Sequence, residues 1–337
     1  MAHRIDCLVP GLCANFDGAD FADAPPLPHL SLLLARGRCI AGPAQTLEAQ
    51  ACALLNVRPD AHGELPFAAL SWLADTGVRP DGPLLRADPV YLRADQTQVR
   101  LFHAEQLGIE RADADALIAT LNAHFTQDGL AFGAPLPYRW YARLPAAARM
   151  QTTPLSAING QPIGEALPTG ADARLWRQRL NEVQMLLHEH PVNVARRARR
   201  QPPVNGVWFW GGAELPGTIA ADYTEIAGDN AVVAGLAKLA GVPLRGDLEG
   251  AARGHRLWSF EALAPWAAFG DWRTWLERLA RLDAVLFAAL TRRLRADGGC
   301  ATLFTGSERD FRVCSLDLKR FWRRVRPPFG RLTCARH

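Results

Sequence analysis

Residues 201–212 read QPPVNGVWFWGG, an apolar run that follows a pair of prolines and stops at two glycines. Because side chains alternate between the two faces of a strand, we expect Val207 and Phe209 on one face and Trp208 and Trp210 on the other. The stretch therefore predicts a strand that carries two indoles on one face and ends at backbone free of side chains.

The glycines Gly211 and Gly212 are expected where the loops of an open α/β sheet line a ligand crevice. Glycines let another group approach the backbone closely, and their N–H groups are suited to holding an anion. Trp208 and Trp210 then have two alternative roles: they wall the crevice, or they pack under an inserted domain. Neither role requires a metal.

Outward from this strand, strands and helices alternate in the first and last thirds of the 337-residue chain. This alternation predicts an α/β core with a mostly parallel sheet, flanked by helices and built from both ends of the chain. Strands around one helix in the middle predict a smaller inserted α+β domain. We expect the core at residues 1–80 and 171–337, the latter with a basic C-terminal tail, and the inserted domain at 81–170.

The segment NEVQMLLHEHPVN, before the tryptophan strand, is the densest polar cluster. Spacings of three and four place its first polar residues on one helix face, where amides and imidazoles are suited to a small anionic or amphipathic ligand. The alternative is that they cap the helix and satisfy buried backbone. The candidate ligand-binding residues in and after this segment are Asn181, Gln184, His188, His190, Asn193, Asn205, Trp208, Trp210, Gly211 and Gly212.

A zinc site formed by His188 and His190 is disfavoured, because residues two apart on a helix diverge. Arg93 in YLRAD and Arg139 in PYRWY lie on expected strands of the inserted domain. A guanidinium fork suits a phosphate or carboxylate ligand, and the alternative is an ordinary ion pair with Asp95 or another acid. We predict no metal ligand and no cofactor.

The net charge of the whole chain is only +4, but the basic residues cluster in two stretches. Four arginines occupy the five positions 196–200 except 198, and the stretch from Leu316 carries seven basic residues against the single acid Asp317. Such patches are solvated surface or bind a nucleic acid or another anionic surface, and Trp322 among arginines is suited to stacking on a base.

The seven cysteines are odd in number and scattered, with no CxxC pair. This pattern favours neither a structural zinc nor a disulfide framework. No signal sequence and no apolar run of about 18 residues is present. We therefore predict a cytoplasmic protein with reduced thiols and no membrane span.

The order of motifs GELPFAAL, DPVYLRAD, GIERADADALIATLN, PYRWYARL, LNEVQMLLHEHPVN, PPVNGVWFWGG and NAVVAGLAKLAGV resembles the cofactor-independent phosphoglycerate mutases of the archaeal type. NEVQMLLHEHPVN with VWFWGG further resembles a bacterial family of phosphoglycerate-mutase-like proteins, some of which are called regulatory proteins of the RpfE type. The resemblance implies an alkaline-phosphatase-like core with an inserted domain. It also implies two divalent metals beside a Ser or Thr nucleophile, a chemistry that needs carboxylate and imidazole ligands.

Early in the chain those groups are replaced. In the resembled family an Asp follows the first strand, where this chain has Pro10, which offers no side-chain oxygen. The nucleophile's position at the start of the next helix but one holds Leu47, with Thr46 the nearest hydroxyl. Thr46 is therefore only a weak catalytic candidate.

Late in the chain the expected Asp-x-x-x-His and Asp-His ligands are also replaced. Glu261 and Asp271 occur without a histidine, and Glu308 is the acid after the last expected strand. No histidine lies between His255 and His337. Asp271 and Glu308 remain weak catalytic candidates.

Three functions stay open. The first is a catalytically degenerate regulatory protein that has lost its metal site and binds a small anionic metabolite or a regulatory protein partner. The second is an active metal-dependent mutase, phosphotransferase or phosphohydrolase with a rearranged site. The third is a nucleic-acid or anionic-surface binder that uses the Arg-rich segments.

Overall fold

The computed structural model describes residues 3–94, 98–103, 107–248 and 254–332. The chain divides into two compact units, Met1–Asn56 with Thr218–His337, and Val57–Gly217. We call these unit 1 and unit 2. Unit 2 is thus an insertion in unit 1, and it is wider than the expected range 81–170.

Unit 1 is built on a seven-stranded sheet in which β1 is central and pairs in parallel with β12 and β13. Both ends of the chain therefore form one mostly parallel sheet, as predicted; only the two strands at one edge, β14 and β2, run antiparallel to their neighbours. In sheet order the strands are β11 (Leu244–Arg245), β10 (Glu225–Ala227), β12 (His255–Ser259), β1 (Arg4–Leu8), β13 (Cys300–Phe304), β14 (Arg309–Cys314) and β2 (Arg38–Ala41).

Several helices of unit 1 begin at a capping side chain or end at a glycine. Thr46 and Asn230 cap the starts of α2 and α8 with their side chains, and Gly241 ends α8 in the left-handed conformation. The helices are α1 (Pro28–Arg36), α2 (Leu47–Leu54), α8 (Ala231–Ala240), α9 (Ala264–Phe269), α10 (Trp272–Leu282), a π-helical turn (Asp283–Phe287), α11 (Ala288–Ala296) and α12 (Phe329–Leu332).

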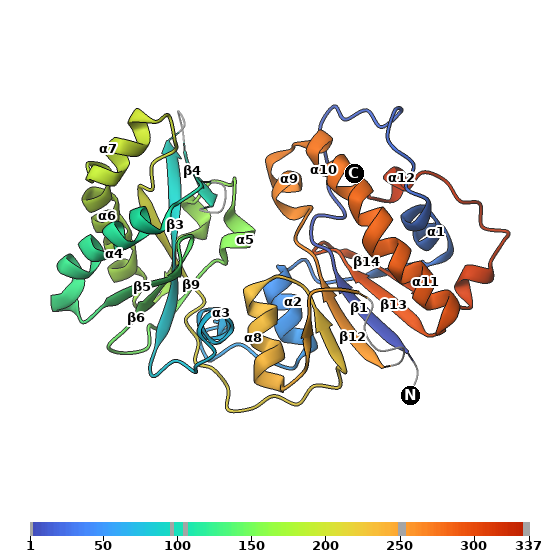
Figure 1. The fold of residues 1–337 in the computed structure, drawn as a ribbon, viewed down its shortest axis with the longest axis horizontal. Coiled ribbons are helices and arrows are strands. Elements are labelled where there is room, and N and C mark those ends of the chain that lie inside the picture. The colour runs from blue at the N-terminus through green and yellow to red at the C-terminus, as the bar shows by residue number, and fades with distance from the viewer. Residues whose placement is uncertain (1–2, 95–97, 104–106, 249–253, 333–337) are drawn as a thin grey trace. The chain divides into compact units, whose positions relative to one another are not determined.

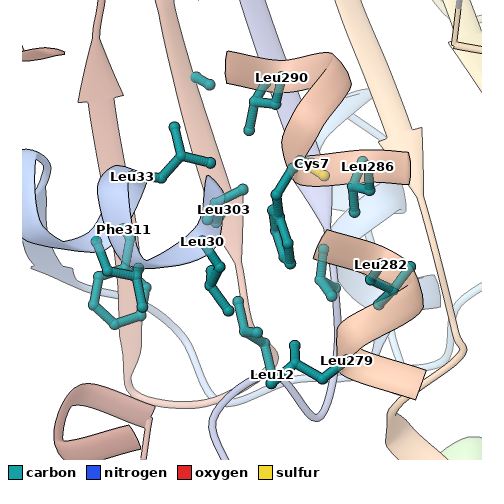
Figure 2. Close-up of a cluster of buried hydrophobic side chains, with 14 of the residues drawn as sticks. Cys7, Leu12, Leu30, Leu33, Leu279, Leu282, Leu286, Leu290, Leu303 and Phe311 are labelled. Atoms are coloured by element: carbon teal, nitrogen blue, oxygen red, sulfur yellow. The ribbon is translucent and has the colours of Figure 1, made fainter. Parts of the chain in front are cut away.

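The main core of unit 1 lies between its sheet and the helices α1, α10 and α11. Leucines at helical spacing, Leu279, Leu282, Leu286 and Leu290, share one cluster with Cys7 of the central strand, and Figure 2 shows Leu279 beside Leu12. Asp6 and Leu8 point to the opposite face because side chains alternate along β1. None of the described helices is both long and apolar enough to cross a bilayer.

One expectation about unit 1 is wrong. Cys300 and Cys314 form a disulfide, although the sequence indicated reduced thiols. The strand at Cys300, expected to be the last one, is followed by β14, which folds back against it. Antiparallel register then places Cys300 directly opposite Cys314, with their Cα atoms 3.9 Å apart.

Unit 2 is an α+β unit around an antiparallel sheet (Figure 1). The long strand β3 (Leu84–Ala94) pairs with β4 (Val99–His103), β6 (Arg139–Arg143) and β9 (Gly206–Trp210), and β6 pairs with β5 (Ala131–Leu136). β3 and β4 pair in antiparallel register, as a short polar stretch between two strand-like runs predicts, and residues 95–97 of that stretch lie outside the described residues. A small second sheet consists of β7 (Met150–Gln151) and β8 (Thr169–Gly170).

Helices cover the unit 2 sheet, and one of them buries apolar side chains that recur at helical spacing, namely Ala114, Leu117, Ile118 and Leu121. The helices are α3 (Phe67–Thr76), α4 (Arg111–Phe125), α5 (Leu155–Ile158), α6 (Ala173–His188) and α7 (Pro191–Ala198). Pro191 sits in the first turn of α7 and separates it from α6, because a proline inside a helix removes a backbone donor.

The strand β9 lies in the antiparallel sheet of unit 2, not in the parallel sheet in which we expected it. The predicted alternation holds: Val207 and Phe209 join the main apolar core of unit 2, and Trp208 and Trp210 are buried on the other face. Phe209 packs edge-on against Trp176 of α6 at 5.0 Å between ring centroids, so α6 and β9 are held in the same unit.

Candidate functional site

The carboxyl ends of the parallel strands of unit 1 bring together the loops that the family resemblance singled out. Pro10 follows β1 and Gly306 follows β13. A Cβ atom on Gly306 would lie 3.2 Å from the carbonyl oxygen of Gln45 and 3.4 Å from the Cβ atom of Pro10. The loop before Thr46 therefore meets the loops after β1 and β13, as a site at this edge requires.

The catalytic candidates in and near these loops are engaged locally. The Thr46 hydroxyl accepts a hydrogen bond from the Ala49 amide at 3.3 Å and caps α2. The Asp271 carboxylate accepts one from the Thr274 amide at 3.1 Å, and hydrogen bonds from Thr274 lower the pKa of Asp271. The side chain of Glu308 is exposed.

These residues do not fit a two-metal centre. Pro10 has no side-chain donor, and no group of three or more His, Cys, Asp or Glu side chains able to hold a metal ion occurs among the described residues. Two divalent metals need several carboxylate or imidazole ligands in one place. Two-metal phosphoryl transfer therefore has no matching ligand set in the described part of this chain.

A different polar cluster occupies the carboxyl ends of β10 and β12. The Asn230 amide nitrogen donates to Glu261 Oε1 at 2.9 Å and to Glu48 Oε1 at 3.4 Å, while its oxygen accepts from the first amides of α8. Glu48 is buried and extends from α2. We call Glu48, Asn230 and Glu261 the amide-bridged acid pair. Neither Glu48 nor Asn230 was among the predicted site residues, although an Asn directly before the apolar run AVVAG is a capping signal.

Ser259 ends β12 beside this cluster. Its hydroxyl is buried and has no hydrogen-bond partner within the described ranges. Gly228, after β10, makes room for it: a Cβ at Gly228 would lie 2.0 Å from Ser259 Oγ, and its φ of +148° also favours glycine. The close approach of these two strand ends therefore depends on Gly228.

Asp310 secures the β13–β14 hairpin at the same edge. It is buried, its Oδ1 accepts from the Thr305 amide at 2.9 Å, and burial raises its pKa. A Cβ at Gly42 would lie 2.1 Å from Asp310 Oδ2. The end of β2 can therefore come this close to the Asp310 carboxyl group only because residue 42 is a glycine.

In unit 2, the paired glycines after β9 do hold an anion, but it is a side chain of the protein. Glu64 Oε1 accepts from the amides of Gly211 and Gly212 at 2.9 and 3.3 Å. Thr152 donates to the same carboxylate through its amide, at 2.8 Å, and its hydroxyl. Burial raises the pKa of Glu64, against the opposing effect of these hydrogen bonds. The predicted anion-binding chemistry is thus present and occupied internally.

Both tryptophans of β9 are buried and hydrogen-bonded within unit 2. Trp208 Nε1 donates to the Thr153 carbonyl at 2.8 Å, and Trp210 Nε1 donates to Asp88 Oδ2 at 2.8 Å. The Arg86 guanidinium lies 5.1 Å above the Trp210 ring and pairs with Asp88 at 2.6 Å. Of the two roles considered for the indoles, these contacts match packing.

Two predicted amides also serve the scaffold. Asn193 is fully buried, donates to the carbonyls of Leu187 and Val204 at 2.7 and 2.8 Å, and accepts from the Val204 amide. Asn205 accepts from the Leu92 amide at 2.7 Å and donates to the Leu92 carbonyl at 2.8 Å. This matches the alternative in which such side chains satisfy backbone.

The junction of α6 and α7 forms an open groove of about 670 Å³. Three predicted ligand-binding residues line it, namely Gln184, His188 and His190, together with apolar atoms of Met185 and Pro191. His190 lies within 3.0 Å of the Thr120 hydroxyl, accepts from the Val192 amide, and has its pKa lowered by burial. We call this the α6–α7 groove.

Asn181 is exposed on the same helix outside this groove. Arg139 forms an ion pair with Asp75, which also accepts from the Tyr141 hydroxyl at 2.6 Å. Arg93 is exposed and lies 4.8 Å above the Phe102 ring, while Asp95, its expected partner, is outside the described residues. The structure therefore does not bring these three residues into one site with the groove.

Residues 61–193 match the family model of 2,3-bisphosphoglycerate-independent phosphoglycerate mutase. Proteins of that name from Methanosarcina barkeri and Methanosarcina mazei are 31% identical over 110 residues and 29% identical over 140 residues. These matches cover 32% and 40% of this chain but only 28% and 35% of the relatives. The match to the family model lies wholly inside unit 2.

Among solved structures, the PH0037 protein from Pyrococcus horikoshii has a TM-score of 0.51 at 14% identity, covering 93% of this chain and 87% of that one. The cofactor-independent phosphoglycerate mutase from Thermoplasma acidophilum has a TM-score of 0.41 at 15% identity, covering 93% and 89%. The predicted fold class is confirmed as an α/β core with a mostly parallel sheet flanked by helices. The chain is similar to the mutase family over the part that the family model covers.

Proposed function

We propose that this chain is a phosphoglycerate-mutase-like protein that acts by binding a small molecule rather than by two-metal catalysis. The observation that carries the proposal is the carboxyl edge of the unit 1 sheet. There Pro10 stands in the place of the first expected ligand, and Thr46 is engaged as a helix cap. The amide-bridged acid pair at this edge holds its two carboxylates on one amide.

Metal binding tests this part of the proposal. The full chain is titrated with Mn²⁺ and Zn²⁺ by calorimetry and assayed for interconversion of phosphoglycerates. We expect neither stoichiometric binding nor turnover. Binding that is lost in both Glu48→Gln and Glu261→Gln, but kept in the exposed control Glu214→Gln, would overturn the proposal, because it would locate a metal at the sheet edge.

The binding function is proposed for the α6–α7 groove. Gln184 and His188 offer hydrogen bonds there, and the exposed thioether of Met185 with Pro191 offers an apolar wall. A small ligand with an apolar body and a carboxylate or phosphate matches this lining. The narrower resemblance to regulatory proteins of the RpfE type supports a regulatory role for that binding.

A library of small phosphorylated and carboxylated metabolites, read by the shift in melting temperature of the full chain, tests the groove. We expect hits whose effect is lost in Gln184→Ala and His188→Ala and kept in Asn181→Ala, a matched exposed amide on the same helix outside the groove. Hits that survive both groove substitutions would refute this location.

An active phosphotransferase with a rearranged site is the second candidate. The convergence of the loops at Pro10, Thr46 and Gly306, with the acids Glu48 and Glu261 nearby, favours it. A panel of phosphoesters assayed with added Mg²⁺ and Mn²⁺ distinguishes the two candidates. Turnover that disappears in Thr46→Ala would establish the second, and uniform inactivity would remove it.

A further inference from the structure

Exposed apolar side chains of the described residues gather in one short stretch. Among the exposed large apolar residues, four fall between positions 316 and 325, namely Leu316, Phe321, Trp322 and Val325. Phe321 is 83% exposed and Trp322 is 66% exposed, and they are the only aromatic residues of that set. We call residues 316–326 the docking segment. Exposed apolar side chains that gather in one stretch mark an interaction site more often than scattered single residues do.

Hydrogen bonds to the end of α1 hold the backbone of the docking segment in place, so its exposed apolar side chains have a fixed position. Arg323 Nη1 donates to the carbonyls of Arg36 and Gly37 at the end of α1, at 3.3 and 2.9 Å, and Arg320 also reaches the Arg36 carbonyl. Cations at the carbonyl end of a helix are favoured by its dipole. Figure 1 shows the chain leading from β14 through a short helical turn to α12. The rings of Phe321 and Trp322 meet edge to face at 5.3 Å.

The exposed charged side chains of the docking segment are all basic. Its single acid, Asp317, is buried, pairs with Arg320 at 2.6 Å and accepts from the Cys314 amide. Lys319, Arg324 and Arg326 are exposed and form no ion pair within the described ranges. The outward surface of the segment is therefore cationic without local compensation.

A neighbouring pair of arginines extends this cationic surface. Arg38 of β2 and Arg312 of β14 are exposed and directly opposite each other in the antiparallel register. Like charges in directly opposed positions destabilise a sheet, and an anionic partner would relieve that repulsion. Arg38 follows Gly37, whose carbonyl accepts from Arg323, so the pair adjoins the docking segment.

We infer that the docking segment binds the surface of an anionic lipid bilayer. Phe321 and Trp322 match the interfacial zone, where aromatic rings sit at headgroup depth, and Lys319, Arg324 and Arg326 match the anionic headgroups. Long basic side chains hold their charge at the headgroups while their methylenes lie along apolar surface. Leu316 and Val325 favour lipid over nucleic acid, because aliphatic side chains do not stack on bases.

Sedimentation of the full chain with vesicles tests this inference. We expect binding to vesicles of phosphatidylcholine mixed with phosphatidylglycerol, little binding to phosphatidylcholine alone, and weakening with salt. The double substitution Phe321→Ser with Trp322→Ser, and the triple substitution of Lys319, Arg324 and Arg326 to Gln, should each weaken binding by about ten-fold or more. Val78→Ser, which removes a similarly exposed apolar side chain from unit 2 outside the α6–α7 groove, should have no effect.

Far-UV circular dichroism of each variant shows whether it folds, which substitutions of exposed side chains should allow. Failure of the unaltered chain to bind anionic vesicles would overturn the inference. So would equal binding by the unaltered chain and the aromatic double variant. A parallel titration with single-stranded oligonucleotide completes the test: aromatic-dependent binding to the oligonucleotide without vesicle binding would assign the segment to nucleic acid instead.

Discussion

The two units differ in whether their buried polar side-chain atoms form hydrogen bonds. In unit 2, Glu64, Asn193 and Trp210 all find partners inside the unit, and none of its described residues buries a side-chain nitrogen or oxygen without a hydrogen bond. In unit 1, buried atoms of Arg256 and Ser259, among others, have no hydrogen-bond partner within the described residues. Unsatisfied buried polar groups are rare in folded proteins and call for an explanation.

This difference in hydrogen bonding follows the division between the part of the chain that is similar to the mutases and the part that is not. The family model matches residues 61–193, which lie in the unit whose polar groups satisfy one another. Unit 1, whose sheet edge would carry phosphotransfer chemistry, lies outside that match. Polar residues that the motifs single out can therefore belong to a scaffold, and a match to those motifs does not transfer an activity.

The largest effect is expected in unit 2 at Glu64. Glu64→Ala removes the acceptor of two glycine amides and of both donors of Thr152, so unfolding in urea should show a loss of about 3–5 kcal/mol. Glu64→Gln should lose less because it keeps one acceptor oxygen. Glu214→Ala, an exposed control three positions or fewer from both glycines, should change stability by less than about 0.5 kcal/mol. A small effect at Glu64 would mean that the internal anion does not hold unit 2 together.

Asn193 should rank next. Asn193→Ala removes both hydrogen bonds to Val204 and one of those to the Leu187 carbonyl, which still accepts from the His190 amide, for an expected loss of about 2–3 kcal/mol in urea unfolding. The matched exposed amide, in Asn181→Ala, should be near neutral. Equal effects at the two positions would contradict the assignment of Asn193 to the scaffold.

In unit 1, Asp6 should make stability depend on pH. Burial raises the pKa of Asp6, but hydrogen bonds from His255 and Tyr223 and the charge of Arg4 outweigh it, so the pKa is lowered on folding. The stabilisation is present above the unfolded value and is lost as pH falls through the folded one. Asp6→Asn should cost about 1–3 kcal/mol at neutral pH.

Urea midpoints measured between about pH 7 and about pH 3 test this assignment, because acid denaturation reports carboxylates that are stabilised by folding. The difference between the unaltered chain and Asp6→Asn should shrink at the acidic end. Asp17→Asn, an exposed control in the same unit, should run parallel to the unaltered chain. A difference that does not change with pH would show that Asp6 acts by packing.

The smallest expected effect comes from a pair of buried serines, one in each unit, that compares the two units directly. Ser71 of unit 2 is buried and accepts from Arg86 Nη1 at 3.1 Å, so Ser71→Ala should cost about 1–2 kcal/mol. Ser259 of unit 1 is equally buried without a partner, so Ser259→Ala should be neutral or stabilise by up to about 1 kcal/mol. Both are read from urea unfolding, and a reversed order would break the contrast between the units.

Periodicity and punctuation predicted most elements, because those signals are local. Thr46 as a cap, Gly241 as a stop and the alternating faces of β9 follow from neighbouring residues alone. The sheet to which β9 belongs did not follow, because its partner β3 is more than a hundred residues earlier. The disulfide of Cys300 was missed for a related reason, since β14 carries charged residues that weaken its strand pattern.

The candidate site was harder to predict than the fold. Gln184, His188 and His190 do line one groove, because they share a helix and its end. The amides of Gly211 and Gly212 were expected to line a ligand crevice, whereas both donate to the carboxyl group of Glu64 inside unit 2. The sequence does not show this contact, because it joins residues far apart in the chain. Likewise, the pairing of Asn230 with Glu48 depends on how two helices meet.

The insertion of unit 2 also sets an order of events during protein synthesis. The central strand β1 emerges first but must wait for β12 and β13, whose residues follow some 250 and 300 positions later. At a translation rate of about 5–20 residues per second, that delay amounts to roughly 12–60 seconds. Unit 2 is complete well before then. On the ribosome the apolar face of β1 would therefore depend on temporary protection, such as a chaperone provides, while the rest of its sheet is still being made.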